Sequence, residues 1–147
     1  MATTGPDIFD TTVQQAHEWL RDIMEEMGWH DRHRAYQALR GTLHALRDHL
    51  TIDEGAQLSA QLPLLIRGIY YEGWDPSRVP VRERHREQFL GHVAEAFKGT
   101  RPVNAEPMAR AVLKVLARRI TAGEAEDVRR MLPGELQTLW PEAVGQR

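Results

Sequence analysis

Residues 51–63, TIDEGAQLSAQLP, and residues 121–133, TAGEAEDVRRMLP, share the pattern that decides the fold. Each stretch opens with Thr-x-x-Glu, a helix capping box, in which the threonine hydroxyl accepts from the backbone N–H three residues on and the glutamate reaches back. Each stretch closes on Leu-Pro, and proline interrupts a helix because it lacks the N–H that an internal turn requires. The pattern therefore predicts a short helix after each threonine and a second short helix beginning at Pro63 or Pro133.

The similarity extends beyond these two stretches, because residues 19–72 align with residues 89–142 without a gap. Apolar positions stay apolar between the two copies, as in Trp19 and Phe89. A fixed internal period of this kind indicates a duplicated structural unit. Identical positions include Leu20, Arg40, Leu43, Leu46, Thr51, Glu54, Leu62, Pro63 and Glu72, each seventy residues before its counterpart.

Two longer helices are expected ahead of the short ones in each copy. Apolar residues recur at helical spacing over 11–27, with Gly28 as a stop, and again over 35–50 after Asp31, a suitable N-cap. The second copy has corresponding stripes over 89–97 and 105–120, and no stretch alternates with the period of two that a strand requires. We therefore predict an all-α fold of two four-helix copies related by an approximate two-fold. The copies are expected to share one core, since either alone would bury too little surface.

The domain organisation follows from this repeat and from the turn-forming residues between the copies. We expect a flexible N-terminal arm over residues 1–10, a first helical repeat over 11–72 and a Pro/Gly linker over 73–82. A second helical repeat is expected over 83–142 and a C-terminal tail over 143–147.

The composition is that of an ordinary globular protein: 41% of the 147 residues are hydrophobic and 27% are charged. No apolar run approaches the roughly 20 residues that a membrane helix needs, and the N-terminus does not have the form of a signal peptide. The chain has no cysteine, which excludes disulfides and thiol catalysis and fits a cytoplasmic location. We expect no membrane association.

The net charge of −2 is unevenly distributed along the chain. Residues 1–75 carry a formal charge of −6, and residues 76–147 carry +4. Such asymmetry concerns association rather than fold, because long-range charge mainly steers encounter with a partner. It predicts salt-sensitive self-association or partner binding.

Three local patterns resemble the DUF2267 family, a group of small bacterial proteins of unknown function. They are the Gly73-Trp74-Asp75-Pro76 linker, the Arg82-Glu83-Arg84 entry to the second copy, and the paired capping-box and Leu-Pro elements. The resemblance implies an all-helical duplicated domain and supplies no catalytic residues. The second copy ends in Pro141-Glu142-Ala143-Val144 instead of Tyr71-Glu72-Gly73-Trp74, so the two copies need not bind the same partner.

No residue pattern specifies an enzyme, a cofactor site or a metal site. His30 and His33 flank Asp31 and could hold a divalent ion, but structural zinc sites usually have four ligands, often thiolates, so we favour a solvated turn. His44 and Asp48 could be a base and its orienting group, but an exposed helical pair is the commoner reading. The chain has no G-x-S-x-G elbow, no glycine-rich phosphate loop and no H-E-x-x-H motif. We assign no catalytic, cofactor-binding or metal-binding residue.

A basic block at the entry to the second copy is a candidate partner surface, although we favour a solvated, salt-bridged surface for it. It comprises Arg78, Arg82, Arg84 and Arg86, with Trp74 beside it. A nucleic-acid face is an alternative reading, but acids are interleaved and the pI is about 6.4, whereas DNA-binding domains typically exceed about 9. A linker tryptophan more often covers a seam than serves as an exposed anchor, and we favour the seam for both Trp74 and Trp29.

These observations predict a non-enzymatic cytoplasmic module for protein interaction or stress association. A protein partner or self-association is expected, and no cofactor is implied. Two alternatives remain from the sequence: binding of nucleic acid or another anionic ligand through the basic second half, and a small-molecule or metal-dependent enzyme.

Overall fold

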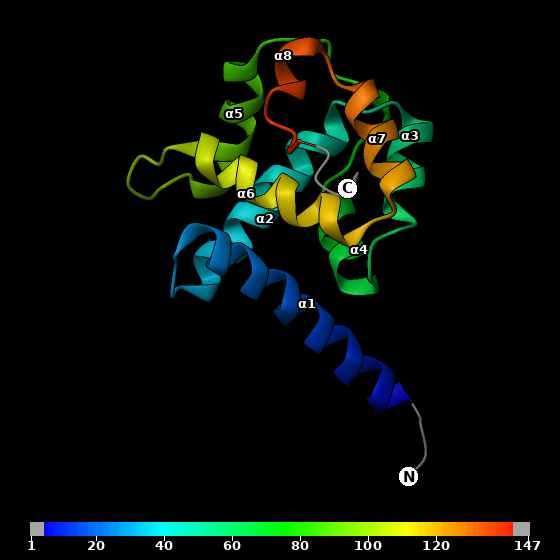
Figure 1. Cartoon of the computed structure of the whole chain (residues 1–147), viewed down its shortest axis with the longest axis vertical. Coiled ribbons are helices and arrows are strands. Elements are labelled where there is room, and N and C mark those ends of the chain that lie inside the picture. The colour runs from blue at the N-terminus through cyan, green and yellow to red at the C-terminus, as the bar shows by residue number, and fades with distance from the viewer. Residues whose placement is uncertain (1–4, 143–147) are drawn as a thin grey trace.

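The structure is a computed structural model that describes residues 5–142 (Figure 1). Within that range every regular element is a helix, which confirms the predicted all-α class. The α-helices are α1 Gly5–Met27, α2 Arg32–Asp48, α3 Ile52–Ser59, α4 Leu64–Tyr71, α5 Arg86–Ala94, α6 Ala105–Arg119, α7 Ala122–Met131 and α8 Gly134–Gln137. Two 3₁₀ turns, η1 Pro76–Arg78 and η2 Glu95–Phe97, lie in the linker and after α5.

The predicted helix starts are confirmed at α2, α3 and α7. The carboxylate of Asp31 accepts from the Arg34 N–H at 3.2 Å and so caps α2. The hydroxyls of Thr51 and Thr121 each accept from the N–H three residues on at 3.1 Å. Helices α4 and α8 begin directly after Pro63 and Pro133, as the Leu-Pro pattern predicts.

The second hydrogen bond of the predicted capping box, from the Thr121 N–H to the Glu124 side chain, is wrong. The Thr121 N–H donates to the side-chain oxygen of Gln61 at 2.9 Å and not to Glu124. The side chains of Glu54 and Glu124 are buried, because α3 packs against α7. These two glutamates therefore belong to a helix interface and do not close a capping box.

Helix α1 begins at Gly5, earlier than the predicted start near Thr11, so residues 5–10 are helical and not part of a flexible arm. Asp7 lies in the first turn, where a carboxylate is favourable next to the helix N-terminus. The N-terminal part of α1 extends beyond the rest of the molecule (Figure 1). Residues 1–4 and 143–147 of the predicted arm and tail lie outside the described residues, and the division into repeats stays a prediction.

One hydrophobic core contains residues from both halves of the chain. Helices α2 and α6 contribute its largest share, including Leu43 and Leu46 from α2 with Val112 and Leu116 from α6. Helix α1 packs on both of them, and α2 also packs against α5. The α2–α5 crossing is close, since a Cβ atom added at Gly41 would lie 2.5 Å from the Val93 carbonyl oxygen.

Some of the opposite charges of the two halves pair with each other at the surface of the same chain. Glu26 of α1 pairs with Lys114 at 3.2 Å and with Arg118 at 2.9 Å, both from α6. Asp22 of α1 pairs with Arg119 at 2.8 Å. Part of the charge asymmetry therefore joins α1 to α6 within one chain and is not left for an external partner.

The threonine caps give a first testable prediction. Thr51→Ala and Thr121→Ala should each lower the free energy of unfolding by about 1 kcal/mol, because each leaves a helix N–H without its acceptor. Chemical denaturation of each variant measures the loss. Thr11→Ala, at an exposed position within α1, is the control and should leave the midpoint nearly unchanged. Cap variants that unfold at the wild-type midpoint would contradict the role of these hydroxyls.

Candidate functional site

The large exposed apolar side chains of the described residues gather mainly on α1 and α4. Two others, Ile52 and Met131, lie on α3 and α7. Phe9 is 65% exposed and Leu64 is 58% exposed, so neither is covered by its own chain. The residues on α1 and α4 are Ile8, Phe9, Val13, Leu64 and Leu65.

A groove runs between α1, α2 and α4, next to these exposed residues. Most of its lining is apolar, and we name it the α1 groove. Its lining residues are Val13, Ala16, His17, Leu20, Tyr36, Leu39, Leu65, Ile66 and Ile69. The groove is open on one side and can accept an apolar ridge from another helix.

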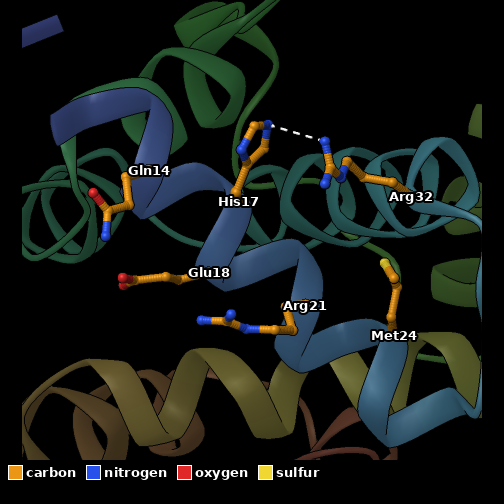
Figure 2. A pocket seen from close by; sticks show the side chains of 6 residues that line it. All are labelled: Gln14, His17, Glu18, Arg21, Met24 and Arg32. Carbon is orange, nitrogen blue, oxygen red and sulfur yellow. Dashed lines mark hydrogen bonds between the residues drawn. The ribbon is translucent and has the colours of Figure 1, made fainter. Parts of the chain in front are cut away.

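A second, more polar hollow continues along α1 toward its C-terminal end (Figure 2). His17 lines both hollows and lies 3.4 Å from Nη1 of Arg32 through its Nε2 atom. Arg21 and Arg32 provide two guanidinium groups here, while Glu18 is the one carboxylate among its lining residues. The lining therefore changes along α1 from mostly apolar to polar, with Arg21 and Glu18 from α1 and Arg32 from α2.

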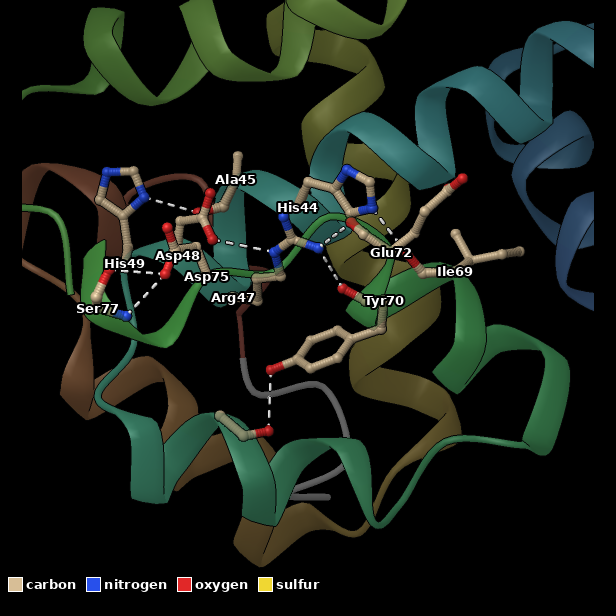
Figure 3. A network of polar contacts seen from close by, with 11 residues as sticks. His44, Ala45, Arg47, Asp48, His49, Ile69, Tyr70, Glu72, Asp75 and Ser77 are labelled. Atoms are coloured by element: carbon tan, nitrogen blue, oxygen red, sulfur yellow. Dashed lines mark hydrogen bonds and ion pairs between the residues drawn. The ribbon is translucent and has the colours of Figure 1, made fainter. Parts of the chain in front are cut away.

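A buried arginine joins α2 to the end of α4 (Figure 3). Arg47, whose side chain is 6% exposed, donates from Nη1 to the carbonyl oxygens of Tyr70 at 2.7 Å and Glu72 at 2.6 Å. Its Nε atom donates to Asp48 at 3.0 Å. Sequence reasoning missed this residue. The available signal was a charged residue on the apolar face of a helix, directly after Leu46.

The predicted His44–Asp48 pair is wrong. His44 donates from Nε2 to the carbonyl oxygen of Ile69 at 2.7 Å, while Asp48 accepts from Arg47. Burial lowers the pKa of His44, so the neutral imidazole that makes this bond is favoured. His44 therefore attaches α2 to α4, while Asp48 bonds to its neighbour on α2, and the two are not arranged as a catalytic base and its orienting group.

Two further histidines meet at the linker. His49 donates from Nδ1 to the Ala45 carbonyl at 2.7 Å, and its buried Nε2 lies 3.6 Å from Glu83. His92 lies 2.8 Å from the same Glu83 oxygen. Burial lowers the pKa of His49. Within residues 5–142 no group of three or more His, Cys, Asp or Glu residues is arranged to hold a metal ion.

Glu54 and Glu124 form a carboxyl pair between α3 and α7. Both are more than nine-tenths buried, and Oε2 of each has no hydrogen-bond donor among the described residues. Burial, together with the contact to the Glu54 carboxyl, raises the pKa of Glu124 to about 7. A proton shared between the two groups would supply the missing donor, which agrees with the raised pKa of Glu124.

A family model described as "Uncharacterized conserved protein (DUF2267)" matches residues 16–139. The chain belongs to the DUF2267 family. No curated protein matches the chain. The family description names no reaction or ligand. The match starts at Ala16, which places Phe9 and Val13 outside the matched residues.

The basic block predicted from the sequence is only partly free in this DUF2267 protein. Arg82 and Arg84 are exposed, and Arg78 lies 3.8 Å from Asp75. The backbone N–H of Arg86 donates to Glu135 at 2.8 Å, and its guanidinium donates to Thr138 at 3.2 Å, so Arg86 helps to attach α5 to α8.

Neither tryptophan in question is fully exposed. Trp74 is half-buried, with its ring centroid 5.2 Å from that of Tyr71. Trp29 is also half-buried and packs against the core, with the Arg34 guanidinium 4.8 Å from its ring centroid. Trp29 therefore covers part of the core, and the seam interpretation stays a prediction for both tryptophans. The role of Trp74 as a partner contact stays a prediction.

The carboxyl pair makes the stability of this DUF2267 protein depend on pH. Because the folded-state pKa of Glu124 is above that of an ordinary glutamate, stability should fall as pH rises from about 4.5 to about 7. Glu124→Gln keeps a hydrogen-bond donor and removes the charge. It should raise the free energy of unfolding at pH 8 by about 1–3 kcal/mol and change it little near pH 4.

Denaturant titrations of the wild type and the variant at several pH values measure this effect. Glu126→Gln is the matched control on the same helix, because Arg129 lowers the pKa of that half-buried carboxyl to about 2. The control should gain no stability at pH 8. A Glu124→Gln variant that is less stable than the wild type at pH 8 would contradict the shared proton.

Proposed function

We propose that this DUF2267 protein is a non-enzymatic helical module that binds a helical protein partner in the α1 groove. The observation that carries this proposal is the group of bare apolar side chains on α1 and α4 beside an open apolar groove. Monomeric proteins rarely expose contiguous apolar surface without a use for it. A groove between helices is a common receptor for one apolar face of an amphipathic helix.

The buried polar groups also support a non-enzymatic role, because they form hydrogen bonds with the protein's own backbone. His44, His49 and Arg47 each bond to backbone carbonyls. Groups held in this way are not available to a substrate. The enzyme alternative therefore gains no support from them.

The nucleic-acid alternative is also weaker than the protein-binding one. Arg118 and Arg119 pair with acids of α1, and Arg129 and Arg130 both pair with Glu126. These arginines do not form a continuous cationic face free of acids, which nucleic acids require. We expect duplex DNA to bind only in the non-specific range of about 10⁻⁴–10⁻⁶ M.

We also infer that the two halves of the module are copies related by an approximate two-fold. Supporting features are the matched threonine caps and the helices that start after Pro63 and Pro133. In addition, Arg67 and Gln137, seventy positions apart, donate to the carbonyls of Leu62 and Leu132.

The absence of cysteine supports a cytoplasmic location. No helix in residues 5–142 is long and apolar enough to cross a bilayer. The stress-associated role stays a prediction.

Affinity capture from native cell extract with the full chain tests the proposed function. Leu65→Asp places a charge in the α1 groove and should abolish capture of specific proteins. Met131→Asp is the matched control, since Met131 is similarly exposed on α7, and it should capture the same proteins as the wild type. Loss of capture with Arg82→Glu/Arg84→Glu but not with Leu65→Asp would move the site to the basic block. Sub-micromolar, sequence-selective DNA binding would favour nucleic acid instead.

A further inference from the structure

The N-terminal part of α1 has the chemistry of a ligand for the α1 groove. Residues 7–13 present Phe9 and Val13, which are 65% and 47% exposed, and two carboxylates, Asp7 and Asp10. They include no basic residue. This segment is therefore an acidic amphipathic helix whose apolar side is uncovered.

The groove has the complementary chemistry. Its apolar floor includes Leu20, Leu65 and Ile69, and it continues into the hollow that holds Arg21 and Arg32, with Glu18 as the one carboxylate there. A helix that fits here needs an apolar ridge beside acidic side chains. The N-terminal part of α1 meets both requirements, but it belongs to the same rigid helix as one wall of the groove and so cannot fold back into it.

A second copy of the chain can supply that helix. We propose that two copies associate through antiparallel α1 helices, with the N-terminal part of each α1 lying in the α1 groove of the other. This inference rests on the proposed function and names its partner. A two-fold interface is self-complementary, so one contact covers both bare segments at once.

The order of charges along α1 supports the antiparallel arrangement. A two-fold axis that crosses α1 beside Val13 and Gln14 brings Asp10 opposite His17 of the second copy. It also brings Asp7 within reach of the Arg21 guanidinium of the second copy. At each end of the pairing an aspartate thus faces an imidazole or a guanidinium of the second copy, whereas a parallel arrangement would place each group beside its own equivalent. Such charge matching sets register and partner choice in paired helices.

Sedimentation equilibrium of the full chain over a range of concentrations tests the proposal. The wild type should form a dimer whose dissociation constant increases with salt. Phe9→Asp and Val13→Asp should each raise that constant by at least about tenfold, as expected when an apolar anchor at an interface becomes charged. Ile52→Asp and Met131→Asp are matched controls at similarly exposed positions on α3 and α7, and they should leave it unchanged. Circular dichroism melts check that each variant stays folded.

Charge exchange tests the register. Asp7→Arg and Arg21→Asp should each weaken the dimer, and the double variant should recover most of the wild-type affinity, because the pair is restored with its signs reversed. A chain that stays monomeric up to the highest attainable concentration overturns the proposal, as does a dimer insensitive to Phe9→Asp. If the chain is monomeric but Leu65→Asp still abolishes capture of another protein, the second-copy proposal fails while the proposed function stands.

Discussion

Arg47→Ala should lower the free energy of unfolding by about 3 kcal/mol, one of the two largest losses we expect from a single substitution in this protein. The variant removes the donors that satisfy the buried carbonyl oxygen of Tyr70 and the part-buried one of Glu72, and a buried acceptor left unpaired costs about 1–3 kcal/mol. Since these two bonds attach the end of α4 to α2, amide protons in α4 should also exchange faster with solvent. Denaturant unfolding and hydrogen exchange measure the two effects.

Arg40→Ala is the matched control for Arg47→Ala. Arg40 lies on the same helix and pairs with the Glu72 side chain at 2.9 Å, but it is 36% exposed. An exposed ion pair contributes about 0–1 kcal/mol, so this control should lose far less stability. Equal losses in the two variants would show that the carbonyl contacts of Arg47 contribute no more to stability than the exposed ion pair of Arg40.

Gly41→Val should lower the free energy of unfolding by at least as much as Arg47→Ala, about 3 kcal/mol. The added side chain does not fit into the close contact between α2 and α5. The new Cβ would lie 2.5 Å from the Val93 carbonyl oxygen and 3.0 Å from the Ala96 Cβ atom. The first of these contacts is with backbone, which a rotamer change cannot relieve, so α5 must move away from α2. Thermal and denaturant unfolding measure the loss.

Gly91→Ala on α5 should raise the free energy of unfolding, in contrast to Gly41→Val on α2. Gly91 lies within α5, and a Cβ atom there would meet nothing within 4 Å. Alanine should therefore stabilise the protein by about 0.5–1 kcal/mol through its higher helix propensity. If Gly41→Val were tolerated as well as Gly91→Ala, the close crossing of α2 and α5 would be wrong.

The fold class and most helix boundaries could be predicted because they depend on local chemistry. Asp31, Thr51 and Thr121 cap helices through bonds to residues three positions away, which a sequence shows directly. The start of α1 was predicted too late, because the apolar pattern of the chain identifies only the part of a helix that packs on the core. Residues 5–10 extend past that core, so the pattern could not mark them.

The candidate site was largely missed, because its features come from contacts between distant segments. The α1 groove joins Val13 with Leu65 and Ile69, and no spacing in the sequence relates these residues. The carboxyl pair joins Glu54 with Glu124, and the capping-box pattern gave those glutamates another role. The basic block was read as one surface, but whether a given arginine is free depends on acids that approach it in space, as Glu135 does at Arg86.

The ion pairs between α1 and α6 fix the direction in which the N-terminal part of α1 extends from the rest of the fold. They hold the C-terminal part of the helix through Asp22 and Glu26. Helix α1 has 23 residues, which corresponds to a length of roughly 34 Å at the usual helical rise. Because the helix is continuous from Gly5 to Met27, fixing one end fixes the direction of the other. A partner held at the N-terminal end is therefore kept at a set distance and angle from α6, and changing the length of α1 by one residue would rotate that partner by about 100°.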